Sequence, residues 1–256
     1  MNDLFIGGGG YSGIVFIGAL EYIHENRLLD LKNFYGCSIG SLIGCLYISG
    51  YTPKDILTKF LELNLEDIVK YNFDNLMSNS YLIDEKLLDT LIGFLPTHGN
   101  ITLGEFSNQF GVNVSIYATN ISKNEYTSLN NTDFPDVKLK DALRASMSIP
   151  FVFKHVEING EKYIDGCCKN IWGSPPEDIY VCGYSIIINS LSNSESYFGQ
   201  LIRSIVPKGM PRSTFTIVCK NKTDPKIYLN LDKLDKRFIL DMYKNGINYA
   251  RETLND

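Results

Sequence analysis

The sequence predicts an α/β protein built on a mostly parallel sheet with flanking helices. Three observations indicate this class. Asp3–Ile6 and Asn33–Cys37 are short, largely apolar stretches typical of strands. Residues 14–27 between them repeat apolar side chains at helical spacing, and a run of glycines joins the first strand to this helix. Strand, helix and strand in this order form a βαβ crossover, which makes the two strands parallel.

The elements further along the chain follow from similar patterns. Residues 53–70 predict a pair of amphipathic helices, and Thr102 followed by Glu105 is typical of a helix N-terminus. Asn159-Gly160 indicates a hairpin turn, whose return strand ends before Asp165. The other expected helices are 41–48, 84–94, 139–145 and 233–253. The other expected strands or extended segments are 112–118, 125–129, 151–153, 157–158, 161–164, 184–188, 213–219 and 226–229.

Composition restricts the class of partner. The 256 residues suffice for one large α/β domain, and 44% hydrophobic with 21% charged residues is ordinary for a globular protein. A net charge of −5 argues against nucleic acid as a partner. The six cysteines lack Cys-x-x-Cys spacing and the three histidines are scattered, which argues against a zinc site and indicates reduced cysteines in an intracellular compartment. We expect a cytoplasmic protein without a signal peptide or transmembrane segment.

A serine elbow is predicted at the end of the second strand. Gly36-Cys37-Ser38-Ile39-Gly40 reads Gly-x-Ser-x-Gly between a strand and an apolar helix. A sharp turn there holds the serine in strained backbone and points its hydroxyl out of the sheet, while Gly36 and Gly40 allow the strand and helix to pass closely. The alternative is a turn of small residues in which Ser38 only caps the helix.

The glycine run from Gly7 to Gly13 allows two interpretations. It matches Gly-x-Gly-x-x-Gly at Gly8, Gly10 and Gly13, the fingerprint of dinucleotide-binding proteins. That fold needs an acidic residue at the end of the second strand, where this chain has Ser38, and no lysine follows the last glycine as in a P-loop. The other interpretation is an oxyanion hole, because adjacent glycines can direct backbone N–H groups at one point.

Asp165-Gly166 follows a predicted strand and supplies a candidate acid. Alone it would be a common Asp-Gly turn. His24, His98 and His155 all precede Asp165, so the order serine, acid, histidine of the α/β-hydrolases is absent. A Ser38–Asp165 dyad therefore remains the candidate catalytic pair.

Together these motifs resemble the patatin-like phospholipases. That family has a glycine-rich loop after the first strand, a Gly-x-Ser-x-Gly elbow after the second, and a later Asp-Gly-Gly or Asp-Gly-Ala. Residues 145–151, Ala-Ser-Met-Ser-Ile-Pro-Phe, are similar to the family's segment ahead of the aspartate. The resemblance implies a three-layer sandwich with a mostly parallel central sheet. It covers a catalytic domain over 4–190, and we expect 191–256 to be a C-terminal extension packed on the same domain.

The resemblance also implies an activity. Ser38 would form an acyl-enzyme with a lipid ester, Asp165 would be the general base, and Gly8, Gly9 and Gly10 would hold the oxyanion, with no metal or organic cofactor. The substrate would be a phospholipid or another acyl lipid, met during transient contact with a membrane surface. Two departures are Ser12, where the family usually has Arg or Lys, and Cys167, where it has Gly or Ala. They motivate one alternative, a non-catalytic lipid- or protein-binding module; a nucleotide-binding protein is the other.

Overall fold

The computed structural model describes residues 1–72, 74, 77–78, 81–170, 185–192, 215–221 and 236–254, the ranges 185–192 and 215–221 by their backbone. The strands are β1 (Asp3–Ile6), β2 (Asn33–Cys37), β3 (Asn113–Asn120), β4 (Glu125–Asn130), β5 (Val156–Ile158), β6 (Glu161–Asp165), β7 (Ser185–Ser192) and β8 (Phe215–Asn221). The α-helices are α1 (Gly13–Glu25), α2 (Ile39–Ile48), α3 (Pro53–Leu61), α4 (Leu65–Ile68), α6 (Lys86–Ile92), α7 (Leu103–Phe110), α8 (Leu139–Met147) and α11 (Lys236–Leu254). Short 3₁₀ helices are η1 (Gly10–Ser12), η2 (Pro96–Gly99) and η3 (Gly166–Cys168).

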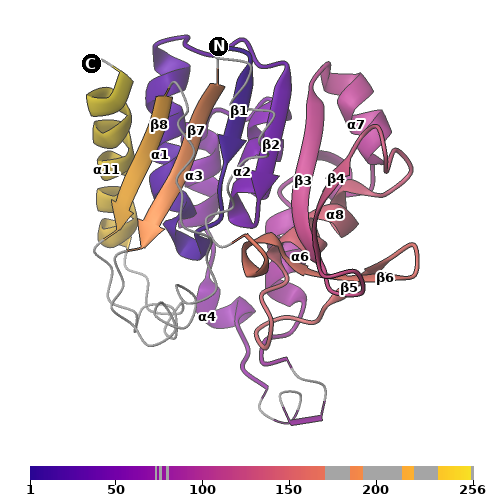
Figure 1. Ribbon diagram of the computed structural model, residues 1–256. Coiled ribbons are helices and arrows are strands. Elements are labelled where there is room, and N and C mark those ends of the chain that lie inside the picture. The colour runs from indigo at the N-terminus through magenta and orange to yellow at the C-terminus, as the bar shows by residue number, and fades with distance from the viewer. Residues whose placement is uncertain are drawn as a thin grey trace.

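All the described strands belong to one mixed sheet, shown in Figure 1. The order is β5-β6-β3-β2-β1-β7-β8, with β4 paired to β3. The pairs from β3 through β2, β1 and β7 to β8 are parallel, whereas β4, β5 and β6 join by antiparallel pairing. The predicted α/β class, with a mostly parallel sheet and flanking helices, is confirmed.

Three polar side chains fix the alignment of the parallel strands at their amino ends. Asp3, Asn33 and Asn113 are in register on β1, β2 and β3. The Asn33 side-chain amide donates to Asp3 Oδ1 (2.7 Å), and the Asn113 amide donates to Asn33 Oδ1 (2.9 Å). A slip of one residue would break this row and turn each strand's apolar face outward. The opposite, carboxyl ends of the three strands are therefore held at defined relative heights.

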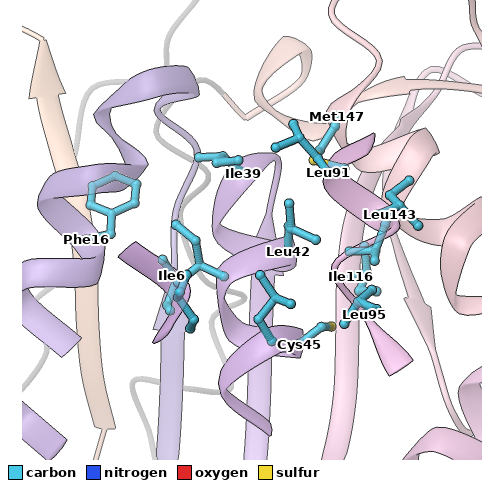
Figure 2. Close-up of a cluster of buried hydrophobic side chains, with 14 of the residues drawn as sticks. Ile6, Phe16, Ile39, Leu42, Cys45, Leu91, Leu95, Ile116, Leu143 and Met147 are labelled. Carbon is cyan, nitrogen blue, oxygen red and sulfur yellow. The ribbon is translucent and has the colours of Figure 1, made fainter. Parts of the chain in front are cut away.

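The main core lies between one face of the sheet and the helices that cover it. Figure 2 shows Leu42 of α2 between Ile6 of β1 on one side and Ile116 of β3 with Leu143 of α8 on the other. The opposite face of the sheet has a smaller buried cluster of Phe5, Cys37 and Tyr117, against which Tyr35, Tyr126 and Cys167 pack. The alternation of strand side chains places Cys37 on this second face.

The C-terminal helix packs against the first helix through two glycines. A Cβ on Gly18 of α1 would collide with the Tyr243 carbonyl of α11, and one on Gly246 would collide with the Val15 carbonyl of α1. Such contacts require the two helix backbones to be nearly in touch, which only glycine allows. Figure 1 shows α11 beside α1 at the β8 side of the sheet. The last described helix thus packs on the same body as the first.

Most sequence-based elements are found within a few residues of their expected bounds. Asn33–Cys37 matches β2 residue for residue, and Thr102 forms the predicted cap, accepting a hydrogen bond from the Glu105 backbone N–H. The expectation that 151–153 is extended was wrong at Phe151, which has φ +65° and is 70% exposed. The N–H groups of Val152 and Phe153 both donate to the Ile149 carbonyl, so this segment closes a turn after Pro150. The expected strand 226–229 lies outside the described residues.

Candidate active site

Two strands that run toward each other bring the predicted catalytic pair together. Cys37 at the end of β2 pairs with Tyr117 of β3, and Asp165 at the end of β6 pairs with the next residue, Ala118. β4 pairs with one edge of β3 at both Tyr117 and Ala118. β2 and β6 therefore pair with the other edge of β3, one after the other along the strand. Because β2 is parallel to β3 and β6 is antiparallel to β3, the carboxyl ends of β2 and β6 meet. Ser38, the residue after β2, therefore lies next to Asp165.

The side chains of these two residues are directly hydrogen-bonded. The Ser38 hydroxyl donates to Asp165 Oδ2 at 2.6 Å, and both residues are buried. The other carboxylate oxygen, Oδ1, accepts from the backbone N–H of Cys167 (2.8 Å). The Asp165 backbone N–H in turn donates to the Ser148 carbonyl (2.9 Å). The carboxylate is thus held from two directions, with one oxygen directed at the serine hydroxyl.

The backbone of Ser38 has the strained conformation expected of an elbow. Its φ is +51° and its ψ is −132°, a region that a residue with a side chain rarely adopts. The Ser146 hydroxyl accepts from the Ser38 N–H (2.8 Å) and donates to the Tyr117 carbonyl of β3 (2.7 Å). The Ser41 hydroxyl donates to the Ser38 carbonyl (2.5 Å). A side chain of α8 and one of the elbow's own helix, α2, therefore hold the elbow on both sides of the strained residue.

Sequence reasoning assigned no role to Ser146. Residues 145–151 were noted only as a segment similar to one found in the family. The hydrogen bond to Ser38 spans 108 residues of sequence, so no local pattern could have revealed it. Thr119 was missed for the same reason: its hydroxyl donates to the Asp165 carbonyl (2.9 Å) and accepts from the Lys169 N–H (3.1 Å). Both residues are polar and fully or almost fully buried.

The glycine loop lies directly beside Ser38. A Cβ on Gly8 would be 3.3 Å from the Ser38 Cβ and would collide with the Cys167 sulfur in its present position. Within the described part of the chain, the backbone N–H groups of Gly8, Gly9 and Gly10 donate to no protein acceptor. The loop turns into η1, where the Ser12 N–H donates to the Gly9 carbonyl (2.9 Å).

The remaining predicted glycines explain how the loop, the elbow and the aspartate turn fit together. A Cβ on Gly40 would collide with the carbonyls of Ile6 and Gly7 at the end of β1. The other motif glycines make similar close approaches: Gly13 to Ile39 and Ile43, Gly36 to Ser41, and Gly166 to the Tyr117 carbonyl and Cys37. All of them join the glycine loop, the elbow and the Asp165 turn into one packed unit.

Burial alters the acidity of Asp165. Loss of solvent raises the pKa of this carboxyl from 3.8 to about 6, although the hydrogen bonds from Ser38 and Cys167 favour the charged form. Asp165 therefore combines a close hydrogen bond from the Ser38 hydroxyl with a raised pKa. Among the described residues, no histidine forms a hydrogen bond with the Ser38 or Asp165 side chain. His24 instead contacts the Tyr47 hydroxyl.

The fold and the site together define a class of protein. It is an α/β protein with a serine elbow at the carboxyl end of a parallel strand, facing a buried aspartate and a glycine loop. Residues 4–170 match the family described as patatin-like phospholipase, so the chain belongs to that family. The resemblance read from the motifs is confirmed.

Relatives and solved structures agree with this assignment. The chain is 27% identical over 189 residues to "Probable lipid hydrolase 463L" of Invertebrate iridescent virus 6, covering 70% of this chain and 63% of the relative. It is 29% identical over 186 residues to "Triacylglycerol lipase 5" of Saccharomyces cerevisiae, covering 67% of this chain and 24% of that protein. This chain thus spans less than two thirds of the length of either curated relative.

The fold is similar to that of two solved proteins. VipD from Legionella pneumophila superposes with a TM-score of 0.60 at 14% identity, covering 99% of this chain and 66% of VipD. ExoU, crystallised with SpcU from Pseudomonas aeruginosa, gives a TM-score of 0.53 at 17% identity, covering 100% of this chain and 51% of the other. At these identities the likeness supports the fold alone. Among the described helices, none is both long and apolar enough to cross a bilayer.

Proposed function

We propose that this chain is a lipid acyl hydrolase of the phospholipase A or lysophospholipase type, with Ser38 as nucleophile and Asp165 as general base. The observation that supports this most directly is the 2.6 Å hydrogen bond from the Ser38 hydroxyl to Asp165 Oδ2, formed inside a buried site. A serine hydroxyl is a weak nucleophile until a neighbouring base removes its proton. A base must lie within hydrogen-bonding reach of that proton, and Asp165 does.

The first half of the reaction forms an acyl-enzyme. Ser38 Oγ attacks the ester carbonyl while Asp165 Oδ2 takes the hydroxyl proton, and the carbonyl oxygen becomes an oxyanion. In this proposal the N–H groups of Gly8, Gly9 and Gly10, which donate to no acceptor among the described residues, hold this oxyanion, with the N–H of Ile39 at the start of α2 as a further donor. The Ser38 N–H is excluded from this role because it donates to Ser146. The leaving alcohol then takes the proton from Asp165.

The second half releases the fatty acid. Asp165 takes a proton from a water molecule as the water attacks the acyl carbonyl, and it passes this proton to Ser38 Oγ as the tetrahedral intermediate collapses to the fatty acid. Every step uses groups of this chain, and one oxyanion donor of this kind is typically worth about 10²–10³ in rate. The names of the relatives suggest the substrate class: one is called a lipid hydrolase and another a triacylglycerol lipase. Because Ser38 is only 5% exposed, the substrate's ester has to enter the protein, which favours transient contact with a membrane surface.

Covalent labelling tests the nucleophile. A fluorophosphonate should add one label to the wild type and none to Ser38→Ala, as read by intact mass. Ser49→Ala is the matched control, because Ser49 lies at the other end of α2 and its hydroxyl donates, among the residues that the structure describes, to the Cys45 carbonyl alone (2.7 Å). The same samples should release fatty acid from phospholipid vesicles in the wild type and control alone. A folded wild type that takes no label would favour the non-catalytic lipid-binding alternative.

The substrate panel decides the type of hydrolase. Vesicles or emulsions of diacyl phospholipid, lysophospholipid and triacylglycerol should be compared at equal ester concentration. Faster release from the phospholipids than from triacylglycerol is the expected result. Preference for triacylglycerol would leave the dyad in place and replace the phospholipase assignment by a lipase.

A further inference from the structure

Two cysteines lie against the candidate catalytic pair on the second face of the sheet. The Sγ atoms of Cys37 and Cys167 are 3.6 Å apart, although the residues are 130 positions apart in sequence. Together with a carboxylate oxygen of Asp165 they form a group whose three ligand atoms all lie within 4.8 Å of one another. Cys37 and Asp165 are buried. Sequence spacing argued against a zinc site because it considers only nearby cysteines, whereas this group assembles through the pairing of β2, β3 and β6.

The spacing of these atoms suits a tetrahedral metal ion. Zinc binds thiolate sulfur at about 2.3 Å, so two sulfurs in a tetrahedral site are about 3.8 Å apart. The observed 3.6 Å is close to that value. Two thiolates and one carboxylate are ligands that zinc and cadmium prefer over magnesium or calcium. We propose that Cys37, Cys167 and Asp165 form a binding site for one thiophilic divalent cation, Zn²⁺ or its probe Cd²⁺.

The surroundings offer the support that a thiolate site needs. The buried Tyr126 hydroxyl faces the Cys37 thiol and forms no hydrogen bond of regular geometry among the described residues. A thiolate formed by metal binding would accept a hydrogen bond from this hydroxyl, and second-shell donors of this kind stabilise metal ligands. Cys167 stands where the family usually has Gly or Ala, so the site would be a property of this chain.

Binding would leave the proposed reaction without its base. The two thiols would each give an electron pair to the cation and release one proton to solvent, with no change of oxidation state. The Asp165 carboxylate would become a metal ligand, and its electron pairs would no longer be available to take the Ser38 proton. This inhibitory consequence, unlike the binding itself, rests on the proposed hydrolase function.

Cadmium titration of the full chain tests the binding. The reduced protein in the Ser38→Ala background, handled without oxygen, should develop the ultraviolet charge-transfer band of cadmium–thiolate bonds and saturate at one tightly bound Cd²⁺. Zn²⁺ should displace the Cd²⁺ and remove the band. Cys167→Ala should weaken this binding at least tenfold, whereas Cys168→Ala, its exposed neighbour, should bind as the Ser38→Ala parent does. Equal Cd²⁺ affinity in Cys167→Ala and Cys168→Ala, or no band at all, would overturn the proposal.

An activity measurement separates this proposal from the proposed function. In the protein with Ser38 intact, Zn²⁺ should inhibit ester release at the concentration that displaces Cd²⁺ from the Ser38→Ala protein. The rate of each variant is compared with the rate of the same variant without metal. Cys167→Ala should need at least tenfold more Zn²⁺ for the same fractional inhibition. A cadmium band that depends on Cys167 in a chain that hydrolyses no ester would sustain the metal site while refuting the hydrolase. Hydrolysis by a chain that shows no such band would refute the metal site and leave the hydrolase function standing.

Discussion

The backbone N–H of Ser38 donates a 2.8 Å hydrogen bond to the hydroxyl of Ser146, a residue of α8. The elbow's own conformation, with φ at +51°, is unfavourable for a residue with a side chain. The bond therefore satisfies a buried donor and fixes a strained residue at the same time. A second hydrogen bond, from Ser146 to the Tyr117 carbonyl, ties this contact to β3.

Ser146→Ala should slow the reaction chiefly through kcat. Removing the hydroxyl leaves the Ser38 N–H and the Tyr117 carbonyl without this partner, at a cost of about 1–3 kcal/mol in the free energy of unfolding. The elbow gains freedom, so kcat should fall more than KM rises. Urea denaturation and steady-state kinetics measure both effects, and Ser146→Thr, which keeps a hydroxyl, should restore much of kcat. Ser148→Ala is the control, since among the described residues its hydroxyl donates to the Arg144 carbonyl alone, and alanine keeps the backbone carbonyl that accepts from Asp165. An equal loss of kcat in both alanine variants would remove the positioning role.

The rate of hydrolysis should depend on the ionisation of Asp165. Burial raises the pKa of this carboxyl to about 6, and only the unprotonated form can accept the Ser38 proton. We expect kcat/KM to fall about tenfold for each pH unit below 6 and to level off above about 7. A pH profile on a soluble ester, with circular dichroism to confirm folding at each pH, checks this. A profile that stays flat down to pH 4.5 would exclude a buried carboxylate as the base.

Asp165→Asn should abolish activity and yet stabilise the fold above pH 6. The folded-state pKa lies above the ordinary 3.8, so the folded chain binds this proton more tightly than the unfolded chain. The stability from this group is therefore fully present below about pH 4 and is lost as the pH rises through 6. Asparagine removes that loss, which should raise the free energy of unfolding by about 1–3 kcal/mol at pH 8 and by nothing at pH 4. Urea denaturation at both pH values measures this. Asp136→Asn, an exposed carboxylate, should change neither value.

Gly246→Ala should destabilise the chain although it improves helix propensity. Alanine in place of a helical glycine normally gains about 1 kcal/mol. Here the new Cβ would collide with the Val15 carbonyl, so α11 would have to move off α1. Thermal denaturation should show a lower Tm for Gly246→Ala and an equal or higher Tm for Asn245→Ala, an exposed position one residue earlier. If both variants were more stable than the wild type, the close crossing of α1 and α11 would not matter for stability.

Local patterns in the sequence were sufficient for the parts of the fold that depend on neighbouring residues. The bounds of β2, the capped start of α7 at Thr102 and the Asn159-Gly160 hairpin all follow from propensities and turn chemistry within a few positions. Ser38 and Asp165 were identified because each lies in a short motif. Phe151 was placed wrongly because the turn after Pro150 depends on carbonyls that sequence patterns do not specify.

The parts that sequence reasoning missed depend on contacts across the sheet. Ser146 and Thr119 are ordinary residues in their own segments, and their roles appear only when β3, β6 and α8 are brought together. The nearness of Cys37 to Cys167 is of the same kind, because it follows from the register of two strands on one neighbour. The raised pKa of Asp165 is also a tertiary effect, since burial causes it.

Because Ser38 and Asp165 are both positioned by adjacent residues of β3, Tyr117 and Ala118, their separation does not depend on how long the connecting segments are. Turns that join the helices between β2 and β3 could lengthen or shorten during evolution without disturbing the pair, whereas α8, between β4 and β6, has to stay in place because its Ser146 holds the Ser38 backbone. The same property makes these turns the natural places to graft foreign segments when the protein is engineered.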